Sequence, residues 1–228
     1  MNPLFERDAF SVRWLDGALL ISRGPLSVLV DAPPNTDLGA DAGRVQAIVL
    51  TSGRMRAIGG LLPVLASLEP YRLQDAAIQL HFPLGEERGA ALTEAWVQGW
   101  PDRYPLTLDA EFPGGQFIAC GLQFDTMPLR AGDPRWRDGS VDDAVAVAVR
   151  ITAPEATVVW IPGAAPQSGL GRMCDGVDLA IIEVGMLDWP RTAERWRLSL
   201  TDAMKIGANA AELWVVGDDG SFGPGEVN

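Results

Sequence analysis

Leu29–Asp31 (LVD) and Ile48–Leu61 (IVLTSGRMRAIGGL) are the two stretches of sequence that say most about the fold. The second stretch opens inside an apolar run, 46–51, which is typical of a short strand buried on both faces of a sheet. Gly53 ends that run, and apolar residues then recur at helical spacing over 58–68. We attribute Gly59 and Gly60, at the start of this predicted helix, to close packing of the helix rather than to phosphate binding.

The remaining sequence alternates in the same way between apolar runs and polar or glycine-rich breaks. Strands are predicted at 10–14, 18–22, 26–31, 46–51, 77–82, 106–112, 116–120, 122–128, 144–151, 157–161, 178–184 and 213–216, and helices at 58–68, 86–98 and 200–211. Ser199 and Asp202 resemble a capping box before the last helix. Many strands with few helices, and no linker between halves, indicate one compact α/β sandwich. We expect a single domain over 1–217 and a fraying Gly- and Asp-rich tail over 218–228.

Composition narrows the class of protein. Of the 228 residues, 47% are apolar and 21% are charged, which is a globular profile rather than a disordered one. The net charge of -12 disfavours nucleic acid as a partner, because a polyanion is repelled by an acidic surface. No run of about 18 apolar residues is present, so no membrane partner is expected.

The N-terminal segment and the cysteines indicate the cellular compartment in which the protein is expected. Met1–Phe10 is charged and has no apolar core, so it is not expected to act as a secretory signal. Cys120 and Cys174 are too few for a disulfide framework, which favours the cytoplasm, and we expect both to be buried thiols. His81 is the single histidine, which excludes a zinc site built from several histidines, and we expect it to be packed or hydrogen-bonded rather than catalytic.

The quoted stretches resemble the metallo-β-lactamase superfamily. There, a strand ending in aspartate precedes a strand that runs into Thr-His-x-His-x-Asp-His-x-Gly-Gly-Leu. The frame of that motif is matched here by Thr51, Ile58, Gly59, Gly60 and Leu61, and Asp31 ends the preceding strand. The ligand positions differ: Ser52 and Arg54 replace the first two histidines, Arg56 replaces the aspartate and Ala57 the third histidine. The resemblance implies an αββα sandwich of four layers, with two mixed β-sheets flanked by helices.

The resemblance covers most of residues 10–217, and its rhythm is most similar to the ribonuclease Z, phosphodiesterase and coenzyme-PQQ-synthesis branch. Further along the chain, Arg130 and Arg197 stand where the family has histidines, and Ala164 stands where it has the bridging aspartate. Asp178 and Glu183 match the family pattern, whereas Gly217 or Asp218 replaces the terminal histidine.

These substitutions change the chemistry that the site can support. A catalytic zinc site needs at least three nitrogen, oxygen or sulfur ligands, and arginine stays protonated and cannot ligate a metal. Two arginine charges a few ångströms from a metal ion would repel it by several kcal/mol, even at an effective dielectric constant of about 20. We therefore expect no metal cofactor, no catalytic residues and no attack by a metal-bound hydroxide.

The arginines leave three interpretations open. They replace the charge of the metals and pair with Asp31, Asp133 or Asp218, or they grip a phosphate or carboxylate, or they point into solvent. The anion-binding interpretation makes the site a set of six residues: Arg54, Arg56, Arg130, Arg197, Ser52 and Asp31.

Three functions follow from these interpretations. The first is a non-catalytic binding or partner protein that binds an anionic small molecule, a protein or a second copy of itself. The second is a hydrolase or phosphodiesterase with an altered site. The third is an interaction subunit that pairs with an active relative.

Overall fold

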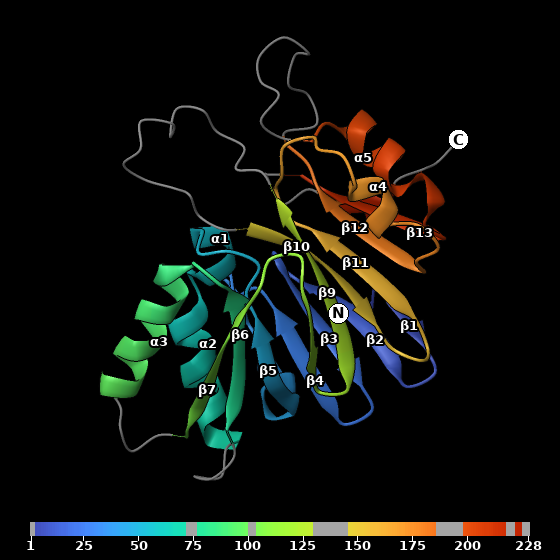
Figure 1. Ribbon diagram of the computed structural model, residues 1–228. Helices are drawn as coiled ribbons and strands as arrows, with labels where there is room; N and C mark the ends of the chain where they lie inside the picture. Colours follow the sequence, from blue (N-terminus) through green and yellow to red (C-terminus); the bar gives the residue numbers. More distant parts are fainter. Residues whose placement is uncertain are drawn as a thin grey trace, which may run out of the picture. The chain divides into compact units, whose positions relative to one another are not determined.

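The computed structural model describes residues 3–71, 77–99, 104–129, 146–185, 198–217 and 222–224. The chain divides into two compact units (Figure 1). The first consists of Met1–Phe112 and Phe117–Leu122, and the second of Pro113–Gln116 and Gln123–Asn228. The expected single domain over 1–217 stays a prediction.

The first unit is built on a seven-stranded mixed sheet in which the strands follow one another in sequence order. The strands are β1 (Phe5–Arg7), β2 (Phe10–Leu15), β3 (Ala18–Arg23), β4 (Leu26–Val30), β5 (Val45–Val49), β6 (Ile78–Pro83) and β7 (Leu106–Glu111). The strands from β1 to β4 pair antiparallel, whereas β4, β5, β6 and β7 run parallel. The carboxyl ends of four parallel strands therefore lie at the same end of this sheet.

Helices connect the parallel strands. They are η1 (Gly39–Arg44), α1 (Met55–Ile58), α2 (Leu61–Leu68), η2 (Glu69–Tyr71) and α3 (Glu87–Gly99). Leu61 and Leu65 of α2 are completely buried in one core with Leu29, Ile48 and Leu80 of the sheet. Burial of apolar side chains on this scale is the main source of stability of such a layer.

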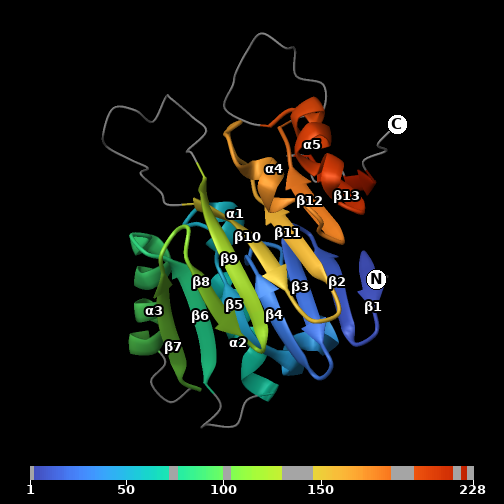
Figure 2. The same cartoon turned by 45° about the vertical axis from the view of Figure 1, so that its right-hand side comes forward.

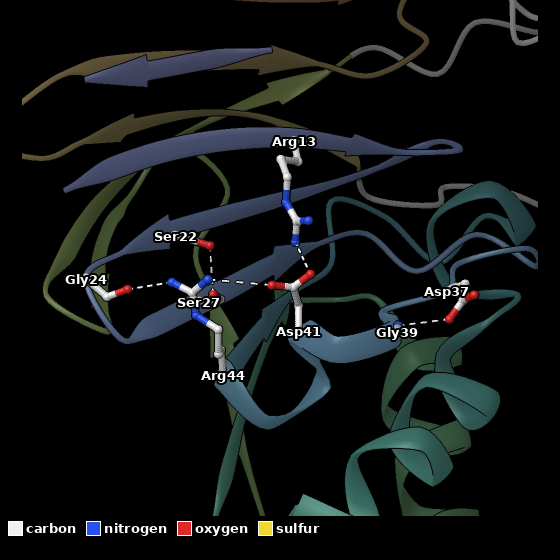
Figure 3. Close-up of polar contacts among 8 residues, drawn as sticks. All are labelled: Arg13, Ser22, Gly24, Ser27, Asp37, Gly39, Asp41 and Arg44. Atoms are coloured by element: carbon white, nitrogen blue, oxygen red, sulfur yellow. Dashed lines mark hydrogen bonds and ion pairs between the residues drawn. The ribbon is translucent and has the colours of Figure 1, made fainter. Parts of the chain in front are cut away.

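A polar network anchors η1 at the amino end of β5 (Figure 3). The carboxylate of Asp41 forms an ion pair with Arg13 of β2 and lies 3.5 Å from Nη1 of Arg44. Nη2 of Arg44 donates a 2.5 Å hydrogen bond to the carbonyl oxygen of Gly24, in the turn before β4. At this end of the sheet, both arginines are matched by a carboxylate or a carbonyl oxygen.

The other seven-stranded mixed sheet, again in sequence order, belongs to the second unit except at Phe117–Leu122, which group with the first unit. Its strands are β8 (Gln116–Ala119), β9 (Leu122–Leu129), β10 (Ala146–Thr152), β11 (Thr157–Ile161), β12 (Leu179–Glu183), β13 (Glu212–Val216) and β14 (Phe222–Pro224). β11, β12 and β13 run parallel, and β9, β10 and β14 pair antiparallel with their neighbours. The helices are α4 (Leu170–Met173), α5 (Leu200–Ile206) and η4 (Gly207–Asn209), and the views in Figures 1 and 2 agree that α4 and α5 lie beside each other.

The expected α/β class with two mixed sheets and helices is confirmed, and so is the capping box, in which Ser199 Oγ accepts from the N–H of Asp202 at 3.1 Å. The helix predicted over 200–211 ends earlier, at Ile206, and one turn of 3-10 helix follows. The tail, expected to fray, contains β14, which pairs with β13. The predicted loop 131–143 lies outside the described residues.

Among the described helices, none is long and apolar enough to cross a membrane.

Candidate functional site

The candidate site in the first unit lies where the parallel strands end. Asp31 follows β4, Thr51 and Ser52 follow β5, and Glu86 follows β6. Loops at the carboxyl ends of parallel strands are where α/β proteins place their ligands. The sequence-predicted residues Asp31, Ser52, Arg54 and Arg56 all lie in the loops at this end of the sheet.

Asp31 fastens β4 to β5. Its side chain is buried, and Oδ1 accepts a 2.7 Å hydrogen bond from the backbone N–H of Thr51, while the Thr51 hydroxyl lies 2.9 and 2.8 Å from the two carboxylate oxygens. The φ angle of Asp31 is +62°, in the left-handed region that aspartate tolerates better than most residues. The aspartate that matches the superfamily motif thus holds the site loop in place.

Gly60 allows the loop to close against the residues after Asp31. The backbone N–H of Gly60 donates to the carbonyl oxygen of Ala32 at 2.7 Å, and the N–H of Ala32 donates to Ala57 at 2.6 Å. A Cβ on Gly60 would lie 2.1 Å from the carbonyl oxygen of Pro33. Close packing, as predicted, explains this glycine.

The ligand positions of the motif present no metal-binding donor set. Ser52 is buried, and its Oγ accepts from the N–H of Arg54 at 3.4 Å. Arg54 precedes α1 and is half-buried, Arg56 is exposed, and Ala57 is buried. The loop therefore offers one hydroxyl, two cations and a methyl group.

Glu86 is a buried carboxylate at the same end of the sheet, and sequence reasoning missed it. It is 4% exposed, and its Oε1 accepts a 2.9 Å hydrogen bond from the N–H of Arg88. The carboxylate lies against Gly53, because a Cβ on that glycine would be 1.9 Å from Oε1. The sequence signal for this contact is Gly53, which by pattern alone indicates only the end of a strand.

The second unit has its own set of loops at the carboxyl ends of β9, β11 and β12. Oε2 of Glu183 accepts a 2.9 Å hydrogen bond from the N–H of Gly163, and the half-buried Glu183 thereby ties β12 to the loop after β11. The carbonyl oxygen of Ala164 accepts from Leu198 at 2.9 Å. Gln167 Nε2 donates to the carbonyl oxygen of Pro128 at 2.8 Å.

These contacts join the end of β9, the loop after β11 and the residue that follows Arg197. Arg130, Arg197, Asp133 and Asp218 themselves lie outside the described residues, so their place in the predicted pocket stays a prediction.

His81 is buried at the end of β6, and its Nδ1 lies 2.8 Å from Oε1 of Glu111. Its ring stacks on Phe117, with centroids 4.6 Å apart. The expectation of a packed, hydrogen-bonded histidine is confirmed.

The two cysteines differ in exposure. Cys174 is buried, and burial, with a smaller contribution from Asp175, raises the pKa of its thiol to about 12. Cys120 is half-buried, so the expectation of a buried thiol is confirmed only for Cys174.

Comparisons with known proteins give the class of fold. No protein-family model matches the chain, and no curated protein matches its sequence. Among solved structures, YhfI from Bacillus subtilis, a metallo-β-lactamase fold protein, is 17% identical with a TM-score of 0.64, over 87% of this chain and 76% of its own. The short form of human tRNase Z is 14% identical with a TM-score of 0.64, over 87% of this chain and 83% of its own. Zn²⁺-bound PqqB from Methylobacterium extorquens is 15% identical with a TM-score of 0.57, over 90% and 73%.

The chain therefore has the metallo-β-lactamase fold, as the motif around Thr51 predicted. The metal that this fold family implies does not fit the described residues. They contain no group of three or more His, Cys, Asp or Glu side chains placed to hold an ion. Asp31, the carboxylate that matches the superfamily motif, already accepts hydrogen bonds from Thr51 through both oxygens.

Proposed function

We propose that this protein is a non-catalytic binding protein of the metallo-β-lactamase fold, in which arginines take the place of the metal ions and bind an anionic ligand. The observation that carries the proposal is the contrast within one loop. Thr51 and Gly60 perform the packing of the motif, whereas the ligand positions between them hold Ser52, Arg54, Arg56 and Ala57.

The arginines support anion binding by their chemistry. A guanidinium group carries a fixed charge and several N–H donors in a planar fork, which suits phosphate and carboxylate groups. Arg54 and Arg56 come from the loop at the carboxyl ends of the parallel strands. Of the four arginines, these two occupy the positions whose alignment with the motif is best defined.

The proposal is tested by thermal unfolding with and without inorganic phosphate. Phosphate at about 100 times its dissociation constant stabilises a one-site protein by about 2.7 kcal/mol, which for a chain of this size is a rise in Tm on the order of 5–10 °C. The double variant Arg54→Ala, Arg56→Ala is expected to lose that rise. A double variant of two exposed arginines outside the loop, Arg7→Ala and Arg172→Ala, removes the same charge and is expected to keep it.

The alternative function is a hydrolase of the superfamily with an altered site. The resemblance to tRNase Z favours it at the level of fold. We expect phosphodiester, lactam and thioester hydrolysis at background rates. Metal-dependent turnover that disappears in Ser52→Ala would establish the hydrolase instead.

A further inference from the structure

The strand β7 forms one edge of the sheet in the first unit (Figure 2). The opposite edge, β1, has only three residues, whereas β7 pairs with β6 over six residues in unbroken parallel register. A long, regular edge strand exposes backbone groups that another strand can bind.

The backbone of β7 shows which of its groups face outward. The carbonyl oxygen of Pro105 accepts from Ile78 at 3.0 Å, and that of Glu111 accepts from Leu84 at 2.7 Å. Parallel pairing alternates, so the residues between them that turn their N–H and C=O away from β6 are Leu106, Leu108 and Ala110. In the described part of the chain, no hydrogen bond reaches these outward groups.

The two faces of β7 differ in chemistry. Leu106 and Leu108 are in register with Ile78 and Leu80 of the helix-covered core, and Leu108 is 42% exposed. Asp109 is on the other face, in register with His81.

Proteins commonly protect an edge strand with lysine, proline or a bulge, and β7 (LTLDAE) has none of these. Its only charges are the carboxylates of Asp109 and Glu111, in a chain with a net charge of -12. Like charges oppose pairing with a second copy of the chain, whereas they attract a basic segment.

We propose that β7 is a docking strand for an extended segment of a partner protein in which apolar residues alternate with lysine or arginine. The segment adds to the sheet through the outward backbone groups of Leu106, Leu108 and Ala110. Its apolar side chains lie beside Leu108, and its basic side chains lie beside Asp109. This site is independent of the arginine loop, so either proposal can fail alone.

The test uses a fluorescein-labelled peptide of eight alternating valine and lysine residues with blocked ends, and fluorescence anisotropy of the full chain. Wild type is expected to bind it saturably. Leu108→Pro is expected to weaken binding at least about tenfold, because proline deletes an N–H that faces outward and leaves the pairing with β6 intact. Leu108→Lys, which keeps the backbone donor and adds a repelling charge, is the second variant if the proline variant does not fold.

Three controls make the outcome decisive. The same peptide with N-methyl groups on alternate residues keeps its charge but cannot pair, and it is expected not to bind. Asp109→Lys is expected to weaken binding, and the Arg54→Ala, Arg56→Ala variant is expected to bind as wild type does. The proposal is overturned by no saturable binding, by equal binding of the N-methylated peptide, or by a wild-type dimer that Leu108→Lys dissociates.

Discussion

The two units fasten the end of a parallel strand in the same way but with different strength. In the first unit, Asp31 at the end of β4 is 3% exposed and receives the backbone N–H and the hydroxyl of Thr51. In the second, Glu183 at the end of β12 is half-buried and accepts a hydrogen bond from the N–H of Gly163.

The comparison shows that the residues of the motif that hold the loop in place can be kept while the metal-ligand positions change. A carboxylate can hold the site loop in each unit although the neighbouring ligand positions are Ser52, Arg54 and Ala164. The acidic residues that match the superfamily are therefore accounted for by hydrogen bonds to the backbone, and a metal ion is not needed to explain their presence.

The largest expected loss of stability comes from substituting the glycines of the two loops. Gly60→Ala would place a Cβ 2.1 Å from the carbonyl oxygen of Pro33, whereas Gly163→Ala would place one 3.4 Å from Glu183, a tight but tolerable distance. We expect Gly60→Ala to lower the free energy of unfolding by about 3 kcal/mol or more, and Gly163→Ala by less than about 1 kcal/mol. Urea denaturation measures both values. Equal losses would contradict the tighter packing assigned to the first unit.

The next largest loss of stability is expected from removing the carboxylates that hold the two loops. Asp31→Ala leaves the buried N–H and hydroxyl of Thr51 without an acceptor, and we expect a loss of about 3 kcal/mol. Glu183→Ala frees one N–H near solvent, and we expect a loss of about 1 kcal/mol.

Asp31→Asn is the matched control for Asp31→Ala, because asparagine also tolerates the left-handed backbone and keeps one acceptor oxygen. It is expected to fall between wild type and Asp31→Ala. A larger loss for Glu183→Ala than for Asp31→Ala would reverse the comparison.

The cysteines give the smallest effect and extend the comparison to reactivity. The Cys174 thiol, with a pKa raised to about 12, is expected to resist 5,5′-dithiobis(2-nitrobenzoate) at pH 8 until urea is added, while Cys120 reacts in the native protein. The unfolded thiol ionises near its ordinary value of 9.0, so stability is fully present below pH 9 and declines as the pH rises toward 12. Rapid native labelling of both thiols would contradict the burial of Cys174.

The fold was predictable because its evidence is local. The frame of the motif, Thr51 with Gly59 to Leu61, and the period of the apolar runs both lie in short windows of sequence. The strands and α-helices that escaped prediction are short: β1, β14, α1 and α4 have three or four residues each. Such elements depend on neighbours that are distant in sequence, so periodicity does not reveal them.

The candidate site was predictable only in its residue types. The substitutions at Ser52, Arg54 and Arg56 are visible in the sequence, but the pairing of Asp31 with Thr51 requires two strands 20 residues apart. The contact of Glu86 with Gly53 depends on the turn after β6, and no spacing rule connects those two positions.

The metal content of the purified protein tests the central claim most directly. The account predicts less than about 0.1 equivalent of zinc, iron and manganese by elemental analysis after dialysis against buffer without chelator, because arginine, serine and alanine occupy the ligand positions. One or more equivalents of tightly held metal would contradict it and would mean that the chain holds a metal ion through other residues.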